Sequence, residues 1–288
     1  MNAKIIAQLA VFAAVVGLII ISTGCIDSEK KTLSESDMEN IKEKILESQN
    51  KIETYKMSME MEMTMESGGM DMSVDSSAEG EVDNRNHKMQ MSMGMNMPML
   101  GETNMEMYFI EDTMYMGMEM MGRTEWVKTE LGETEKENIW NQQSYIEKEM
   151  GMIKNSKVEL SGDEKVRGVD SWVIKITPDK NSLEEYVMSE MSQSSSELDE
   201  DEMPGMDFKN IEIKYWIAKD SYFITKQEAQ MDFTMTDEKS GESMNIEMDV
   251  SVELYDYNEP VNIVLPKDAL NAKSSDEMIG GINNDLII

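Results

Sequence analysis

The chain has little of what most compact functional sites are built from. Among its 288 residues there are one cysteine and one histidine. A disulfide framework is therefore excluded, and so is a zinc site with the usual Cys and His ligands. Only 26 Lys and Arg stand against 58 Asp and Glu, which gives a net charge of −32 at pH 7. Because nucleic-acid binding needs basic side chains to neutralise phosphates, we expect no nucleic-acid partner.

Sequence signatures of catalysis and of cofactor binding are also missing. There is no glycine-rich phosphate loop and no nucleophile elbow. His87 is predicted to be a surface residue, because no partner for general-base chemistry stands near it in the sequence. The acidic run Asp199–Glu202 lacks the glycine and the twelfth-position glutamate of an EF-hand loop and is predicted to be a solvated loop. We therefore expect no enzymatic activity, no cofactor and no metal requirement for folding.

The N-terminus has the features of a lipoprotein signal peptide over residues 1–24. Ile5–Ile21 is an apolar run, interrupted by Gln8, and is shorter than a comfortable membrane span of about 20 residues. The run ends just before Ser22-Thr23-Gly24-Cys25, where small residues precede the single cysteine and resemble a lipobox. We predict that Cys25 is lipidated and anchors the chain on the outer face of the cytoplasmic membrane. The alternative is an uncleaved signal anchor in which Cys25 is incidental.

Three segments of the mature chain show the 3.6-residue apolar period of amphipathic helices. Each opens with a capping box, in which a Ser or Thr is followed three residues later by a Glu. The capping residues are Ser36, Thr134 and Ser182. The sequence predicts a helix after each of them.

Elsewhere apolar residues recur at every second position, which is typical of strands with one wet and one apolar face. Short turn signals such as Ser67-Gly68-Gly69 separate the runs, so neighbouring strands are predicted to be antiparallel. The pattern predicts an α+β fold with about ten strands and three helices. Residues 25–33 are expected to be a tether, Ser192–Asp207 a mobile loop, and residues 273–288 a weakly ordered tail.

The order of these elements resembles the LolA/LppX-like superfamily of lipoprotein and lipid carriers, and in particular its archaeal lipoproteins. The resemblance extends over residues 34–272. It implies a half-open barrel, a curved antiparallel sheet partly closed by helices with an apolar ligand between them, and no shared catalytic residues. The chain departs from the family in having methionine where other members more often have Val, Leu or aromatic residues. The segments that carry the resemblance are Thr54-Tyr55-Lys56, Trp126-Val127-Lys128, Val166–Asp179, Tyr215-Trp216-Ile217 and Tyr257–Pro266.

Methionine is the most unusual feature of the composition, with 33 residues, of which twenty fall between Met57 and Met121. Three interpretations remain open. Methionine fills the core, although strand propensity favours β-branched residues; or it forms a deformable surface for apolar ligands; or its thioethers bind Cu(I). For copper the best candidates along one strand are Met93, Met95 and Met97, near Pro98. The predicted contacts of an apolar ligand, most simply a lipid, are Met61, Met63, Met91, Met93, Met107, Met116 and Met118.

Two function classes follow from the sequence. One is a membrane-anchored protein that binds or carries a lipid or another hydrophobic molecule in a methionine-lined cavity. The other is a surface interaction or sensor module in which the same space is filled by the protein's own side chains. An open methionine-lined concavity favours the first class and a solid core favours the second.

Overall fold

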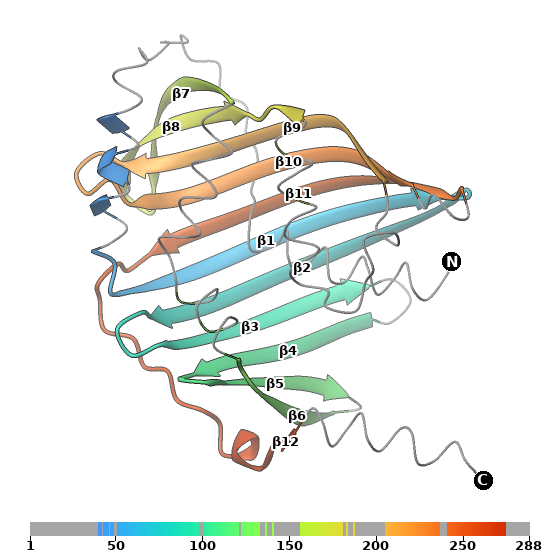
Figure 1. Cartoon of the computed structure of the whole chain (residues 1–288), viewed down its shortest axis with the longest axis vertical. Coiled ribbons are helices and arrows are strands. Elements are labelled where there is room, and N and C mark those ends of the chain that lie inside the picture. Colours follow the sequence, from blue (N-terminus) through green and yellow to red (C-terminus); the bar gives the residue numbers. More distant parts are fainter. Residues whose placement is uncertain are drawn as a thin grey trace. The chain divides into compact units, whose positions relative to one another are not determined.

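The computed structural model describes residues 51–97, 101–120, 122–132, 156–180, 205–236 and 241–274, together with helical residues at 40–41, 43–45, 47–48, 136, 140, 183 and 187. These residues form a large, mostly antiparallel sheet with little helix. The strand order is β12-β6-β5-β4-β3-β2-β1-β11-β10-β9-β8-β7 (Figure 1). The prediction of an antiparallel meander is confirmed, and the sheet has twelve strands where the sequence predicts about ten.

The strands are long and most of them follow one another through short turns. Their bounds are β1 Thr54–Ser67, β2 Met70–Asp83, β3 Lys88–Met97, β4 Gly101–Ile110, β5 Thr113–Met120, β6 Arg123–Glu130, β7 Lys157–Val166, β8 Val169–Thr177, β9 Gly205–Ala218, β10 Ile224–Thr236, β11 Ser243–Tyr255 and β12 Lys273–Ser274, with a 3-10 helix η2 at Asp268–Asn271. Val166 pairs with Val169 across the β7–β8 turn, and the two turn residues, Arg167 and Gly168, have φ values of 46° and 88°. This is the geometry of a tight hairpin that suits strand twist.

The chain divides into two compact units. The first unit comprises Met1–Ser48, Met59–Asp75 and Ile146–Glu253, and the second comprises Gln49–Ser58, Ser76–Tyr145 and Leu254–Ile288. Strands β7 to β10 belong to the first unit, and β3 to β6 with η2 and β12 belong to the second. The division passes through β1, β2 and the end of β11, so each of these strands contributes residues to both units.

In the first unit one face of the sheet is a solid apolar core. Met231 of β10 lies opposite Ile211 of β9 and Met248 of β11, and Phe233 lies opposite Ile246. Met231, Phe233, Ile246 and Met248 are each 1 % exposed. Close packing of this kind is typical of a protein interior and leaves no room for a further side chain.

The other face of this unit carries a row of charges across four strands. Glu159 of β7 pairs with Lys175 of β8, Lys175 with Lys214 of β9, and Lys214 with Glu228 of β10. Directly paired residues on antiparallel strands point to the same side of the sheet, so the four charges lie on one line, with two lysines between a glutamate at each end. Lys214 is 8 % exposed and Glu228 is 4 % exposed, which is unusually deep burial for two titratable side chains.

The N-terminal helical residues of the first unit contact the turn that joins β9 to β10. Lys44 donates a hydrogen bond from Nζ to Tyr222 Oη at 3.0 Å, and its ammonium lies 4.7 Å from the centroid of the Tyr222 ring. Ser48 donates from Oγ to the carbonyl oxygen of Tyr222, also at 3.0 Å. These contacts fix the helix at the end of the β9–β10 hairpin.

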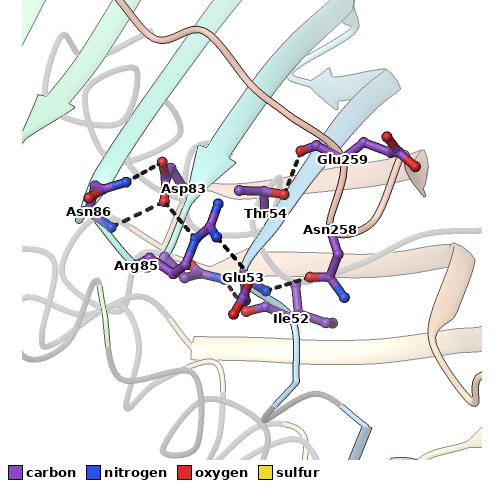
Figure 2. A network of polar contacts seen from close by, with 9 residues as sticks. Ile52, Glu53, Thr54, Asp83, Arg85, Asn86, Asn258 and Glu259 are labelled. Atoms are coloured by element: carbon purple, nitrogen blue, oxygen red, sulfur yellow. Dashed lines mark hydrogen bonds and ion pairs between the residues drawn. The ribbon is translucent and has the colours of Figure 1, made fainter.

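In the second unit a polar network joins the start of β1, the β2–β3 turn and the chain that follows β11 (Figure 2). The Asp83 carboxylate accepts the backbone N–H of Asn86 at 3.1 Å, which closes the turn, and Arg85 forms an ion pair with Glu53 at 2.9 Å. The backbone N–H of Glu53 donates to Asn258 Oδ1 at 2.8 Å, and Thr54 Oγ1 donates to the carbonyl oxygen of Glu259 at 2.7 Å (Figure 2). The network sets the direction in which the C-terminal segment leaves the sheet.

Parts of the second and third predicted helices are among the described residues. Lys136 N–H donates to the carbonyl of Gly132, and Leu183 N–H donates to that of Asp179, at 3.0 Å each. The capping residues that the sequence predicts, Ser36, Thr134 and Ser182, lie outside the described residues.

Two segment boundaries differ from the predicted ones. β9 begins at Gly205, so residues 205–207 are strand and not the end of the predicted loop over Ser192–Asp207. Lys273 and Ser274, which the sequence places in the tail, pair in parallel with Val127 and Lys128 of β6. The signal peptide, Cys25, the 25–33 tether, the rest of the loop, and residues 275–288 lie outside the described residues.

Candidate functional site

A methionine surface extends across β3, β4 and β5 of the second unit. The register places Met91 opposite Met107, and Met107 opposite Met116, in one row. The next row is formed in the same way by Met93, Met105 and Met118. Since paired residues point to the same side of an antiparallel sheet, both rows lie on one face. The same face also carries Met89, Met95, Phe109 and Met114. We call this surface the methionine face.

Most side chains of the methionine face are neither buried nor fully exposed. Met91 is 9 % exposed and Met118 is 38 % exposed, and these are the extremes of the two rows. The remaining members, Met89, Met93, Met95, Met105, Met107, Met114 and Met116, are partly buried. An apolar face in this intermediate state differs from a packed core, where such residues are buried within a few per cent.

The opposite face of β4 to β6 packs against the C-terminal segment. Tyr108 and Trp126 form a cluster with Ile263, Ala269 and Ala272, and the rings of Tyr108 and Trp126 are 5.9 Å apart. Gly117 lies opposite Trp126, and a Cβ on Gly117 would be 2.8 Å from Cζ2 of the indole. Glycine at this point makes room for the ring. The C-terminal segment therefore covers the face away from the methionines.

The structure brings together only part of the predicted ligand contacts. Met91, Met93, Met107, Met116 and Met118 all lie on the methionine face. Met61 and Met63 belong to the first unit and are each 4 % exposed. Their burial leaves little surface for a ligand. The copper candidates Met93 and Met95 share the methionine face, and Met97 lies at the end of the same strand, next to Pro98, which is outside the described residues.

A polar pocket of about 320 Å³ lies at the ends of β4 and β5, lined by Glu102, Asn104, Glu119 and Gly122. Asn104 Nδ2 donates a hydrogen bond to Glu119 Oε2 at 3.2 Å. Asn104 and Glu119 alternate with the methionines along their strands, so they point to the other side of the sheet. This pocket is thus not the methionine-lined concavity that the sequence predicts.

The sequence reasoning missed the charged row of the first unit. Its signal is the alternation of unlike charges at i and i+2 in Glu212/Lys214 and Lys226/Glu228, which places each pair on one side of a strand. Burial raises the pKa of the Glu228 carboxyl, against the opposing attraction of Lys226 and Lys214. For Glu212 burial acts in the same direction, but Lys175 and Lys214 outweigh it and lower the pKa of the carboxyl.

The tryptophans differ in burial, and the single histidine lies at the surface, as the sequence predicts. Trp126 and Trp216 are buried at 8 % and 3 % exposure, while Trp140 and Trp172 are partly buried. His87 is exposed, and its ring stacks on Trp140 with centroids 5.2 Å apart. Within the described residues no three His, Cys, Asp or Glu side chains gather as metal ligands. In the same part of the chain, no helix is long and apolar enough to cross a membrane.

The sequence belongs to a family whose own function is unknown. Residues 37–274 match the family described as "Family of unknown function (DUF6612)", so the chain is a member of it. No curated protein matches the chain.

Several solved structures are similar to this one at low sequence identity. LprF from Mycobacterium bovis is 13% identical, with a TM-score of 0.44, over 82% of this chain and 99% of that one. The lipoprotein LppX from Mycobacterium tuberculosis is 11% identical, with a TM-score of 0.41, over 80% of this chain and 100% of that one. A putative outer membrane lipoprotein-sorting protein domain from Vibrio parahaemolyticus is 12% identical, with a TM-score of 0.27, over 81% and 97%.

Proposed function

We propose that the chain is a membrane-anchored extracytoplasmic lipoprotein, without enzymatic activity, that binds a lipid or another hydrophobic molecule on its methionine face. The observation that carries this proposal is the partial burial of that face. Residues in both of its three-methionine rows, Met93, Met105, Met107 and Met116 among them, retain accessible apolar surface on adjacent strands. An apolar surface that extends over three adjacent strands and is left partly accessible is typical of a binding site.

Methionine suits such a site because its side chain is unbranched and polarisable. It adapts to ligands of variable shape, and it is over-used at surfaces that accept several partners. Burying each CH₂ of an acyl chain contributes about 0.8 kcal/mol. A chain lying along the two rows would therefore gain enough to offset the entropy of association. The half-open barrel implied by the resemblance would place helices over this face, with space for the ligand between.

The membrane anchor is the second part of the proposal and depends on Cys25. Lipidation at Cys25 would hold the domain at the outer face of the cytoplasmic membrane, beside a source of apolar ligand. The Cys25→Ser variant should leave the precursor uncleaved or release the protein from membranes. An intact mass of the mature protein with an unmodified Cys25 would overturn this part alone.

Ligand binding is tested with a fluorescent fatty acid and the double variant Met93→Glu/Met116→Glu. Two carboxylates on the face should reduce probe binding at least tenfold, because a bound acyl chain would have to desolvate them. Met70→Glu is the matched control, since Met70 lies in the first unit and is already 65 % exposed. It should bind the probe as the wild type does. If the wild type binds no apolar probe, or if the double variant folds and binds it normally, the proposal is wrong.

A further inference from the structure

The row formed by Met93, Met105 and Met118 has a second chemical property besides being apolar. The three residues come from three adjacent strands, β3, β4 and β5, and each is directly opposite the next. Cβ atoms of directly opposed residues are about 4.5–5.5 Å apart. Two methionines of one strand, such as Met93 and Met95, are separated by about 6.5–7 Å. Thioethers therefore approach one another more closely across the strands than along them.

The sulfur atoms of the three methionines can approach one point with little steric hindrance. The outer strands β3 and β5 each lie about 4.7–4.9 Å from the central strand β4. Met93 and Met118 need only lean toward Met105 for the three sulfur atoms to surround one point above β4. The flexible methionine side chain permits this without backbone movement. Partial burial leaves all three side chains free to reorient, with Met118 at 38 % exposure.

We propose that Met93, Met105 and Met118 form a trigonal thioether site for Cu(I). Thioether sulfur is a soft ligand that selects Cu(I), while Zn²⁺, Ca²⁺ and Mg²⁺ prefer thiolate, imidazole or oxygen ligands. The site is distinct from the arrangement that the sequence suggests, in which Met93, Met95 and Met97 of one strand are the ligands. It is independent of lipid binding, because it requires sulfur where the lipid requires only apolar surface.

The other methionine row is a weaker candidate. Met91 is 9 % exposed, and the row of Met91, Met107 and Met116 continues to Val127 of β6. The row of Met118 continues instead to Glu125, whose side chain is 64 % exposed and lies 4.0 Å from Lys273. A carboxylate beside the three thioethers favours a bound cation electrostatically, and the net charge of −32 attracts cations to the whole chain.

The test is an anaerobic Cu(I) titration of the full chain in detergent, in competition with a coloured Cu(I) chelator. Every sample carries Cys25→Ser, so that no thiol competes for the metal. The Met93→Leu, Met105→Leu and Met118→Leu variants should each weaken Cu(I) binding at least tenfold. Leucine keeps the volume and apolarity of methionine, so these variants should fold normally, with the circular dichroism of the sheet unchanged. Copper X-ray absorption should show three sulfur neighbours and no nitrogen.

The matched control is the triple variant Met59→Leu/Met61→Leu/Met63→Leu, which removes three thioethers of one strand in the first unit. It should bind Cu(I) as tightly as the parent protein. Equal weakening in the control, no stoichiometric Cu(I) binding, or a spectrum with nitrogen or oxygen ligands would each overturn the proposal. Loss of fatty-acid binding in Met93→Glu/Met116→Glu tests the lipid site separately, so failure of one proposal is distinguishable from failure of the other.

Discussion

The two units carry methionine with the same two-residue period and in different surroundings. In the first unit Met59, Met61, Met63 and Met65 of β1 are 4–5 % exposed, and Met231 and Met248 are 1 % exposed. In the second unit the methionines of β3, β4 and β5 are mostly partly buried. The first set fills a core and the second lines an accessible face. Methionine content alone does not distinguish these roles, whereas the exposure of each face does.

The other face of the sheet also differs between the two units. In the first unit the face away from the core carries the row Glu159, Lys175, Lys214 and Glu228. In the second unit the face away from the methionines packs Trp126 against the C-terminal segment. The second unit thus also has a tightly packed face, and it is not the methionine face. This leaves the methionines available for binding.

Truncation of a methionine should separate the two units most clearly. Met248→Ala removes a side chain that is 1 % exposed and should cost about 2–5 kcal/mol, because the core cannot collapse into the space. Met116→Ala, on the partly buried face, should cost less than about 1 kcal/mol. Urea unfolding of both variants measures the difference. Equal losses would show that the methionine face is packed as tightly as the core.

The packed face of the second unit is tested at its glycines. Gly117→Ala places a Cβ 2.8 Å from the rigid Trp126 ring and should cost about 1–3 kcal/mol through overpacking. Gly94→Ala is the matched control, because its Cβ would meet Asn104 Oδ1 at an ordinary 3.6 Å. That change should be neutral or slightly stabilising. A harmless Gly117→Ala, measured by thermal unfolding, would mean that Trp126 does not pack against β5 as described.

Mild oxidation compares the two methionine sets in one experiment. Exposed thioethers become sulfoxides first, and the product is polar. After limited hydrogen peroxide treatment, peptide mass spectrometry should find Met70 and Met118 oxidised several-fold faster than Met61 and Met63. Fatty-acid binding should disappear while the circular dichroism of the sheet is unchanged. Uniform oxidation, or unfolding before loss of binding, would contradict the distinction between core and face.

Much of this arrangement is predictable from alternation alone. The runs at Met57–Met65, Met89–Met97 and Met114–Met120 predict strands with one apolar side, and the turns between them predict antiparallel neighbours. The register follows from the short turns, so the row of Met91, Met107 and Met116 is within reach of sequence reasoning. The period of two does not say what covers a face, since that depends on contacts between residues far apart in the chain. For this reason Met61 and Met116 look alike in the sequence.

The buried charges could not be predicted from the two-residue alternation alone. The charged row requires Lys175 and Lys214 to be paired across β8 and β9, and those strands are joined by a long segment. Register across such a connection is not encoded by turn length. The alternating pairs Glu212/Lys214 and Lys226/Glu228 are the local signs of it.

The smallest expected effect concerns the two glutamates of the first unit, whose pKa values are shifted in opposite directions. Burial raises the pKa of Glu228 above the ordinary 4.5, so the folded state favours its neutral form. Its contribution to stability is present below pH 4.5 and is lost as the pH rises through the raised pKa. Glu212 is the reverse case. Lys175 and Lys214 outweigh the effect of burial on the Glu212 carboxyl and lower its pKa, so the stability from Glu212 is present above pH 4.5 and is lost in acid.

The variants Glu228→Gln and Glu212→Gln should therefore diverge as the pH rises. Relative to wild type, Glu228→Gln should gain stability between acid and neutral pH, while Glu212→Gln should lose it, each by less than about 1 kcal/mol. Thermal midpoints measured from about pH 3 to pH 7 give the two slopes. Parallel slopes would mean that the row does not hold one carboxyl against ionisation and the other in favour of it. Slopes of opposite sign would show that the face away from the core in the first unit contributes to stability through its charges, whereas the face around Trp126 in the second unit does so through apolar packing.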